Sequence, residues 1–418
     1  MSDKLGKIRI LHVAQAAGGV DRYIRMLFKY MDHDKFENIL VCSHDFKRVD
    51  YNGLADAFEH VDMQRPIGKA DIDAMKAVRR LIRKYQPDIV YAHSSKAGAI
   101  ARVANIGLKK NDDKIKCIYN PHGWAFNMRC GKKKQMVYTA IEKMAAPFCD
   151  KIICISEAEK QSALDKKICK QDKLQVIVNG IDIEEYEQRK IAGLSTVSRK
   201  SCGIPESAFV VGMVGRISEQ KAPDVFIKAA KQIKQKIPEA CFMIVGDGPD
   251  REMIEEYARE NNIALFISGW VENASDYISL FDVALLLSRW EGFGLVIPEY
   301  MLAGKPVVAS RVDAIPEIVK DTENGLLVKP DDIDGTSNAV LELYKEGALQ
   351  MKLRNKGMIT VHEKFDVKRT AKESEMLLNS VINGGGQYEL IAVILPEVLC
   401  VSCRVRQTCY AAAEMAVA

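Results

Sequence analysis

Long hydrophobic runs are missing from this sequence of 418 residues. No stretch approaches the roughly 18 consecutive apolar residues that indicate a membrane-spanning helix. The segment Met1–Lys7 leads directly into a strand-like run and has no apolar core, so we expect no secretory signal peptide. Together these absences predict a protein that works in the cytoplasm.

A strong net charge is also missing, since the formal net charge is only +4. Nucleic-acid-binding domains concentrate basic residues on one face, and a balance this small gives no reason to expect a nucleic-acid partner. Apolar residues make up 48% of the chain and charged residues 28%, which is typical of a globular protein. The length allows two or three domains.

The cysteines form neither a disulfide framework nor a metal site. Most of those before residue 387, such as Cys42, Cys117 and Cys154, stand singly in apolar, strand-like runs, which is typical of buried free thiols in a reducing compartment. Near the C-terminus, Cys400 and Cys403 have the spacing of metal ligands, but a fourth ligand and histidines are lacking there. We therefore expect no metal and no cofactor.

Strand-like apolar runs alternate with amphipathic segments in both halves of the chain, which predicts α/β domains. The expected strands lie within residues 8–13, 39–43, 87–93, 117–124, 152–157, 176–182, 209–216, 240–249 and 283–287. The expected helices cover residues 21–31, 71–85, 223–236, 331–346, 351–363 and 367–381. A dinucleotide fingerprint is excluded after the run at 240–249, because Arg251 replaces its third glycine.

One strand, turn and helix unit in the second half organises the whole chain. Its turn carries Glu291 and the run Gly292-Phe293-Gly294, and its helix carries Glu299. A carboxylate accepts hydrogen bonds from vicinal sugar hydroxyls, and successive backbone N–H groups can hold a hydroxyl or phosphate oxygen. The alternative is two surface glutamates beside an ordinary turn. The spacing alone leaves both interpretations open.

Arg216 ends the strand-like run at 209–216, and Lys221 lies in the polar stretch that follows. Arginine binds phosphate in a forked geometry and lysine adds a compact charge, so the pair can neutralise a diphosphate as negative charge builds on it. The alternative is two solvated surface cations.

Three further candidates stand where expected strands of the first half end. The Gly18-Gly19 turn follows the first strand, and a glycine turn before a helix is a natural anion site; the alternative is a tight turn without a ligand. His93 and His122 both terminate strands. Ligands of open α/β sheets gather at the carboxyl ends of strands, so we expect both imidazoles to face one crevice. The alternative for each is a structural histidine.

The sequence resembles the retaining glycosyltransferases of family 4. Glu291 and Glu299 match the family's E-x7-E motif, including the Gly-Phe-Gly after the first glutamate. The likeness extends over residues 304–310, 316–319 and 324–328, and over Pro121-His122-Gly123 and Asn179-Gly180-Ile181-Asp182. Departures are Asp313-Ala314-Ile315, where the family has Gly-Gly, and Ala222, where glycine is usual.

The resemblance implies a GT-B fold, in which two Rossmann-like α/β domains face each other across a cleft and a C-terminal helix crosses back to the first domain. We expect an acceptor-binding domain at 1–185, a linker at 186–200, a nucleotide-sugar-binding domain at 201–365 and the crossover helix at 366–383. Residues 384–418 are expected to be an atypical, disordered tail.

The resemblance also implies roles for the candidate residues. The implied catalytic set is His122, Arg216, Lys221 and Glu291. The implied donor-binding set is Gly18, Gly19, Arg216, Lys221, Gly292, Phe293, Gly294, Leu295 and Glu299. His93 and Asn120 are candidates for binding the acceptor.

The expected reaction is a metal-independent transfer of a sugar, with retention, from a nucleotide diphospho-sugar of the UDP type to a hydroxyl. A nucleotide-sugar 2-epimerase and a non-catalytic sugar-nucleotide-binding protein remain the alternatives. The likeness to the polysaccharide-building members implies a lipid-linked or saccharide acceptor in bacterial surface polysaccharide synthesis.

Basic clusters at residues 79–84 and 132–134 add a further expectation. Such a face is usually only solvated, but it can instead lie against an anionic membrane. We expect the enzyme to work at the inner face of the plasma membrane.

Overall fold

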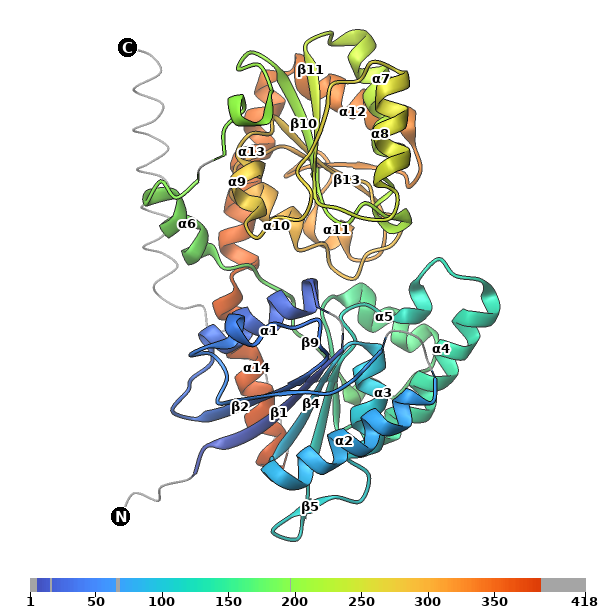
Figure 1. Cartoon of the computed structure of the whole chain (residues 1–418), viewed down its shortest axis with the longest axis vertical. Helices are drawn as coiled ribbons and strands as arrows, with labels where there is room; N and C mark the ends of the chain where they lie inside the picture. Colours follow the sequence, from blue (N-terminus) through green and yellow to red (C-terminus); the bar gives the residue numbers. More distant parts are fainter. Residues whose placement is uncertain (1–5, 16, 65–67, 196, 385–418) are drawn as a thin grey trace. The chain divides into compact units, whose positions relative to one another are not determined.

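The computed structural model describes residues 6–15, 17–64, 68–195 and 197–384 (Figure 1). Nearly all of the predicted tail, residues 385–418, lies outside the described residues. Within them the chain forms two large parallel β-sheets, which confirms the predicted α/β class. No helix in this described part has the length and apolar character to span a membrane.

The first sheet has the strand order β3-β2-β1-β4-β7-β8-β9. Its strands are β1 (Ile8–Ala14), β2 (Phe36–Cys42), β3 (Ala57–His60), β4 (Ile89–His93), β7 (Lys116–Asn120), β8 (Lys151–Cys154) and β9 (Leu174–Val176). The helices between them are α1 (Gly19–Tyr30), α2 (Ala70–Tyr85), α3 (Ser95–Ala104), α4 (Lys132–Ala145) and α5 (Glu157–Asp165). A short antiparallel ribbon, β5 (Lys109–Lys110) with β6 (Asp113–Lys114), extends from the loop before β7.

The two faces of the first sheet differ in chemistry. Alternate side chains such as Leu11, Val13 and Val90 pack in one apolar cluster with α2, α3 and α5. The intervening side chains include His12, Tyr91 and His93, and Phe28 of α1 packs edge-on against His12. Because successive strand residues point to opposite faces, this sheet has one apolar face and one face with a polar row.

The second sheet has the order β12-β11-β10-β13-β14-β15. Its strands are β10 (Phe209–Val214), β11 (Ala240–Val245), β12 (Leu265–Ile267), β13 (Val283–Leu286), β14 (Val307–Ser310) and β15 (Leu326–Val328). Its helices are α7 (Pro223–Lys236), α8 (Arg251–Glu260), α9 (Ala274–Ile278), α10 (Val296–Leu302), α11 (Ile315–Ile318), α12 (Ile333–Lys345) and α13 (Gly347–Lys364). In Figure 1, α7 and α12 lie on one side of this sheet and α9 and α10 on the other.

Helices also occupy the segments that connect to the second sheet and follow it. The polar stretch after the first sheet contains α6 (Ile183–Ile191), which begins because the Asp182 carboxylate accepts a hydrogen bond from the Glu185 N–H. The last described helix is α14 (Val367–Ile382). Its Thr370 hydroxyl donates to the Val178 carbonyl at 2.9 Å, and its Glu375 carboxylate accepts from the Asp32 N–H at 2.6 Å. These bonds confirm that the last helix returns to the first domain.

Candidate functional site

Two adjacent loops form the centre of the candidate site. They follow β10 and β13, whose pairing sets Val211 beside Val283. The Lys221 ammonium forms an ion pair with Oε2 of Glu291, and the Ser288 hydroxyl donates to the same oxygen at 3.0 Å. The loops are also tied through their backbones, since the Arg289 N–H donates to the Gln220 carbonyl at 2.8 Å. The structure thus places Lys221 against Glu291, two residues that are far apart in the sequence.

The glycine turn after Glu291 offers unused backbone donors. The N–H of Glu291 itself donates to Oδ2 of Asp313 at 2.7 Å, so the departure from Gly-Gly in this chain has a structural role. Burial raises the pKa of the Asp313 carboxyl. By contrast, the N–H groups of Gly292, Phe293 and Gly294 donate to no other residue in the described part of the chain. Three successive unpaired N–H groups suit an anion or a hydroxyl oxygen.

Arg216 is an exposed cation in the loop after β10, the loop that also carries Lys221. It follows β10 directly, and no carboxylate of the described residues forms an ion pair with it. A guanidinium with five donors and no protein partner is available to a ligand. Lys221, in contrast, is largely buried and already paired.

Glu299 is buried on α10, and its carboxylate pairs with Arg22 of α1. Burial raises the pKa of Glu299 above its usual value, and the neighbouring Arg22 guanidinium offsets only part of this rise. Gly18 and Gly19 are exposed just before Arg22, at the start of α1. The structure therefore brings the Gly18-Gly19 turn of the first domain close to Glu299.

His122 lies in a tight turn after β7. Its backbone has a φ of 52°, a left-handed conformation that costs energy for a residue with a side chain. Two bonds hold the turn: the His122 N–H donates to Oδ1 of Asn120 at 3.0 Å, and the Gly123 N–H donates to Oε1 of Glu159 at 2.7 Å. Burial raises the pKa of Glu159 to about 7. Strain that the surroundings support in this way is typical of functional sites.

His93 and Asn120, the acceptor candidates, are both fully buried. His93 Nδ1 lies 3.1 Å from Nε2 of His122, so the two histidines do meet. His93 Nε2 lies 3.1 Å from His12 Nδ1, and Asn120 Oδ1 accepts from the His122 N–H at 3.0 Å, so both residues support His122 from within the protein.

The turn with His122 and the turn with Glu291 touch through their backbones. A Cβ atom added to Gly292 would lie 2.9 Å from the His122 carbonyl oxygen and 3.2 Å from Cα of Gly123. Only glycine permits this approach. The two clusters of candidate residues are therefore parts of one site.

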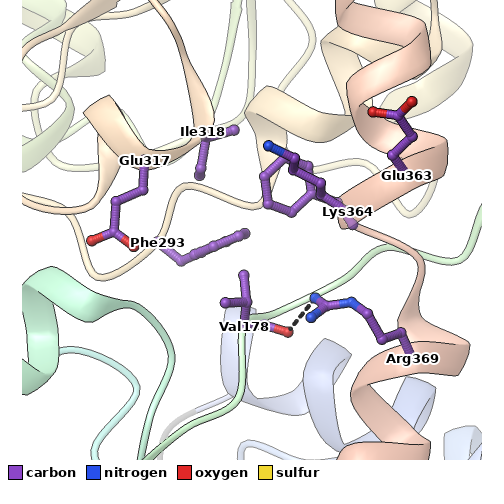
Figure 2. A pocket seen from close by; sticks show the side chains of 8 residues that line it. Val178, Phe293, Glu317, Ile318, Glu363, Lys364 and Arg369 are labelled. Atoms are coloured by element: carbon purple, nitrogen blue, oxygen red, sulfur yellow. Dashed lines mark hydrogen bonds between the residues drawn. The ribbon is translucent and has the colours of Figure 1, made fainter. Parts of the chain in front are cut away.

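A cavity of about 250 Å³ lies behind the glycine turn. Figure 2 shows its lining, with Arg369 bonded to the carbonyl of Val178. The Phe293 ring is buried here and packs edge-on against Phe365, with ring centroids 5.8 Å apart. The ring of Phe293 therefore anchors the turn by packing against Phe365.

Comparisons with known proteins decide the family. The sequence profile described as "Glycosyltransferase Family 4" matches residues 17–185, and that described as "Glycosyl transferases group 1" matches residues 195–358. A protein from the cps region of Klebsiella pneumoniae, described as uncharacterized, is 30% identical over 80% of this chain and 89% of its own length. The chain belongs to the family 4 glycosyltransferases.

Other relatives of this glycosyltransferase match at similar levels. The UDP-Gal:alpha-D-GlcNAc-diphosphoundecaprenol alpha-1,3-galactosyltransferase of Escherichia coli is 29% identical over 92% of this chain and 100% of its own length. The capsular polysaccharide biosynthesis glycosyltransferase CapM of Staphylococcus aureus is 25% identical over 77% of this chain and 84% of its own.

Solved structures confirm the GT-B fold. The Anabaena protein HepE, in complex with UDP and glucose, matches with a TM-score of 0.75 at 21% identity, over 89% of this chain and 100% of that chain. Sucrose-phosphate synthase from Thermosynechococcus elongatus matches with a TM-score of 0.76 at 19% identity, over 91% and 100%.

Several residues that shape this glycosyltransferase site were missed by sequence reasoning. They are His12, Arg22, Glu159 and Glu317. The Glu317 carboxylate accepts from the N–H groups of Glu157 and Ala158, in the first turn of α5, at 3.0 and 2.6 Å. His12 had one available signal, because a histidine inside an otherwise apolar strand calls for a buried partner. Glu317 also had a signal, since it lies in the stretch 316–319 that carries the family likeness. Arg22 and Glu159 have ordinary helical surroundings in the sequence and gave no signal.

Proposed function

We propose that this glycosyltransferase moves a sugar from a UDP-sugar to a hydroxyl of a lipid-linked saccharide, with retention at the anomeric carbon and without a metal ion. The observation that carries the proposal is the pairing of Lys221 with Glu291 next to three unpaired N–H groups, with the unpaired Arg216 in the same loop as Lys221. We also propose that the domain boundaries are those predicted from the sequence.

Each residue has a proposed role in this reaction. As the bond from the anomeric carbon to the diphosphate breaks, negative charge builds on the departing oxygens, and Arg216 and Lys221 stabilise it. Glu291 orients Lys221 and binds sugar hydroxyls together with the N–H groups of the glycine turn. Glu299 binds the ribose.

His122 is proposed to bind the donor sugar beside the acceptor. Because His93 and Asn120 are fully buried, we propose that they support His122 and do not touch the acceptor.

The Escherichia coli relative guides the choice of substrates, because this chain matches it over 100% of its length. The purified protein is incubated with UDP-galactose and GlcNAc-diphosphoundecaprenol in the presence of EDTA, and the product is analysed by NMR. We expect an α-linked product from the α-linked donor. A β-linked product would overturn retention, and activity that requires added Mg²⁺ would overturn metal independence.

The same assay separates the alternatives. An epimerase would convert the donor to an epimer without any acceptor. A non-catalytic binding protein would gain thermal stability with UDP-sugars, because a ligand stabilises the state that it binds, and would form no product with any donor and acceptor.

We further propose that the enzyme is cytoplasmic and docks on an anionic membrane through α4. The exposed face of this helix carries Met136, 71% exposed, and Met144, 67% exposed, with Val137 between them and Phe148 just beyond the helix end. Exposed lysines at 132–134 and 143 surround these side chains. Apolar side chains ringed by lysines match a membrane interface, where each basic residue contributes about 1 kcal/mol.

The basic face of α2 suits this role less well. Lys84 pairs with Glu59 at 2.7 Å, and Nη1 of Arg79 donates to the carbonyls of Ala104 and Ile106, both at 2.8 Å. These charges are partly used within the protein.

Sedimentation with phosphatidylglycerol-containing vesicles tests the membrane proposal. We expect the protein to pellet at low salt and to be released at about 1 M salt, where the screening length is about 3 Å. The double variant Met136→Ser, Met144→Ser should stay in the supernatant. Met351→Ser is the matched control, because Met351 is 64% exposed on α13. A wild-type protein that stays in the supernatant at low salt would contradict the proposal.

A further inference from the structure

A row of hydrogen-bonded imidazoles crosses the polar face of the first sheet. Asn38 comes from β2, His12 from β1, His93 from β4, and His122 from the turn after β7, and these strands are neighbours in the sheet. Asn38 Oδ1 lies 3.2 Å from His12 Nε2, and His12 Nδ1 lies 3.1 Å from His93 Nε2. His93 Nδ1 lies 3.1 Å from His122 Nε2. Each ring nitrogen of the two inner histidines therefore has one partner within the row.

The row excludes charge from its members. Asn38, His12 and His93 are 0% exposed. Burial lowers the pKa of His12 to about 3 and that of His122 to about 3. Burial also lowers the pKa of His93, and the neighbouring His12 and His122 lower it further. A neutral imidazole has one donor nitrogen and one acceptor nitrogen. The nitrogen that carries the proton in His12 therefore determines which nitrogen carries it in His93 and in His122.

The protons can then be assigned one after another. The amide of Asn38 turns Oδ1 toward His12, while its Nδ2 has no partner among the described residues. With the amide in this orientation the oxygen only accepts, so the proton of His12 sits on Nε2 and its Nδ1 accepts from Nε2–H of His93. Nδ1 of His93 in turn accepts from Nε2–H of His122. This leaves Nδ1 of His122 without a proton, and that nitrogen bonds to no other described residue.

Aromatic rings fix the planes of the imidazoles. Tyr91 lies 4.2 Å from His93, Phe28 lies 4.7 Å from His12, and Tyr23 lies 4.6 Å from His122, measured between ring centroids. Consecutive imidazoles are near-parallel, with interplanar angles of 11° and 25°. An imidazole that rotated by 180° would lose its hydrogen bonds inside this aromatic surrounding. The same ring nitrogens therefore stay protonated along the row.

We propose that Asn38, His12 and His93 are positioning residues that hold His122 in the Nε2–H tautomer, so that its Nδ1 is a hydrogen-bond acceptor for a hydroxyl of the donor sugar. The sugar contact rests on the proposed function, but the tautomer does not. A fixed acceptor selects a sugar with a hydroxyl at that position, because an analogue without it leaves the nitrogen unpaired.

The test is a long-range ¹H–¹⁵N NMR experiment on the full chain labelled with ¹⁵N-histidine, without ligand. Signals are assigned from variants in which one histidine at a time is replaced, since the signals of that residue then disappear. We expect the wild-type protein to show protonated Nε2 and bare Nδ1 for His122. Asn38→Leu, which removes the accepting oxygen, should give a mixture of tautomers at His122. Asn38→Asp, which keeps an acceptor, should preserve the wild-type pattern. A purely structural role of Asn38 would leave the tautomer of His122 unchanged in Asn38→Leu.

The outcomes separate this inference from the proposed function. A fixed Nδ1–H tautomer or a mixture of tautomers at His122 in the wild-type protein overturns the inference, whether or not any variant folds. A fixed Nε2–H tautomer in a protein that transfers no sugar supports the inference and refutes the function. In an active enzyme, Asn38→Leu should lower kcat/KM about tenfold, as expected for the loss of one hydrogen bond.

Discussion

Replacing Lys221 by alanine should lower kcat about a thousandfold. Lys221 is the one candidate cation that is both largely buried and held by Glu291 among the described residues. A preoriented positive charge stabilises a departing diphosphate without reorganising, and removing one such donor costs about 10²- to 10³-fold in rate. The measurement is initial rates at saturating donor, with the melting temperature measured in parallel.

The variant also leaves Glu291 without its partner, so stability and catalysis need to be separated. The double variant Lys221→Ala, Glu291→Gln removes the unpaired charge, and we expect it to recover the melting temperature without recovering turnover. Lys228→Ala is the matched control, because Lys228 is exposed on α7 in the same domain. Turnover near the wild-type level in Lys221→Ala would refute the role assigned to Lys221.

Gly292→Ala should reduce turnover about a hundredfold. The added methyl group would meet the backbone of His122 and Gly123 at 2.9 and 3.2 Å, and neither partner is a flexible side chain. The two turns must then separate, and misplacement by about 1 Å costs about 10²-fold in rate. The affinity for UDP alone should change less than kcat, because UDP lacks the sugar next to His122.

Gly347→Ala serves as the control for this prediction. Gly347 begins α13, and a Cβ atom there meets nothing within 4 Å. Full activity in Gly292→Ala would show that the close approach of the two turns is not needed for transfer.

The regular elements were largely predictable because their signals are local. The helix predicted at 223–236 has those bounds in the structure, with proline in its first turn. The buried strands follow from apolar runs, and Ser156 caps α5 by accepting from the Glu159 N–H, which is a local contact. Local patterns determine such features without knowledge of the rest of the chain.

The partners inside the site were not predictable in the same way. Strand ends predicted that His93 and His122 share one region, and the structure places them in contact. The contact of His12 with His93 depends on the pairing of β1 with β4, two strands that do not follow one another along the chain. The pairing of Arg22 with Glu299 joins residues of the two domains, and one sequence contains no signal for it.

The imidazole row has a consequence for how this protein can change over evolutionary time. Its members share their hydrogen bonds, so a single replacement leaves a buried polar atom unpaired, at a cost of about 1–3 kcal/mol. A related protein in which one of these four residues is replaced has little stability to gain from keeping the other three. The row should therefore be inherited whole or replaced whole, as one trait spread over residues 12, 38, 93 and 122.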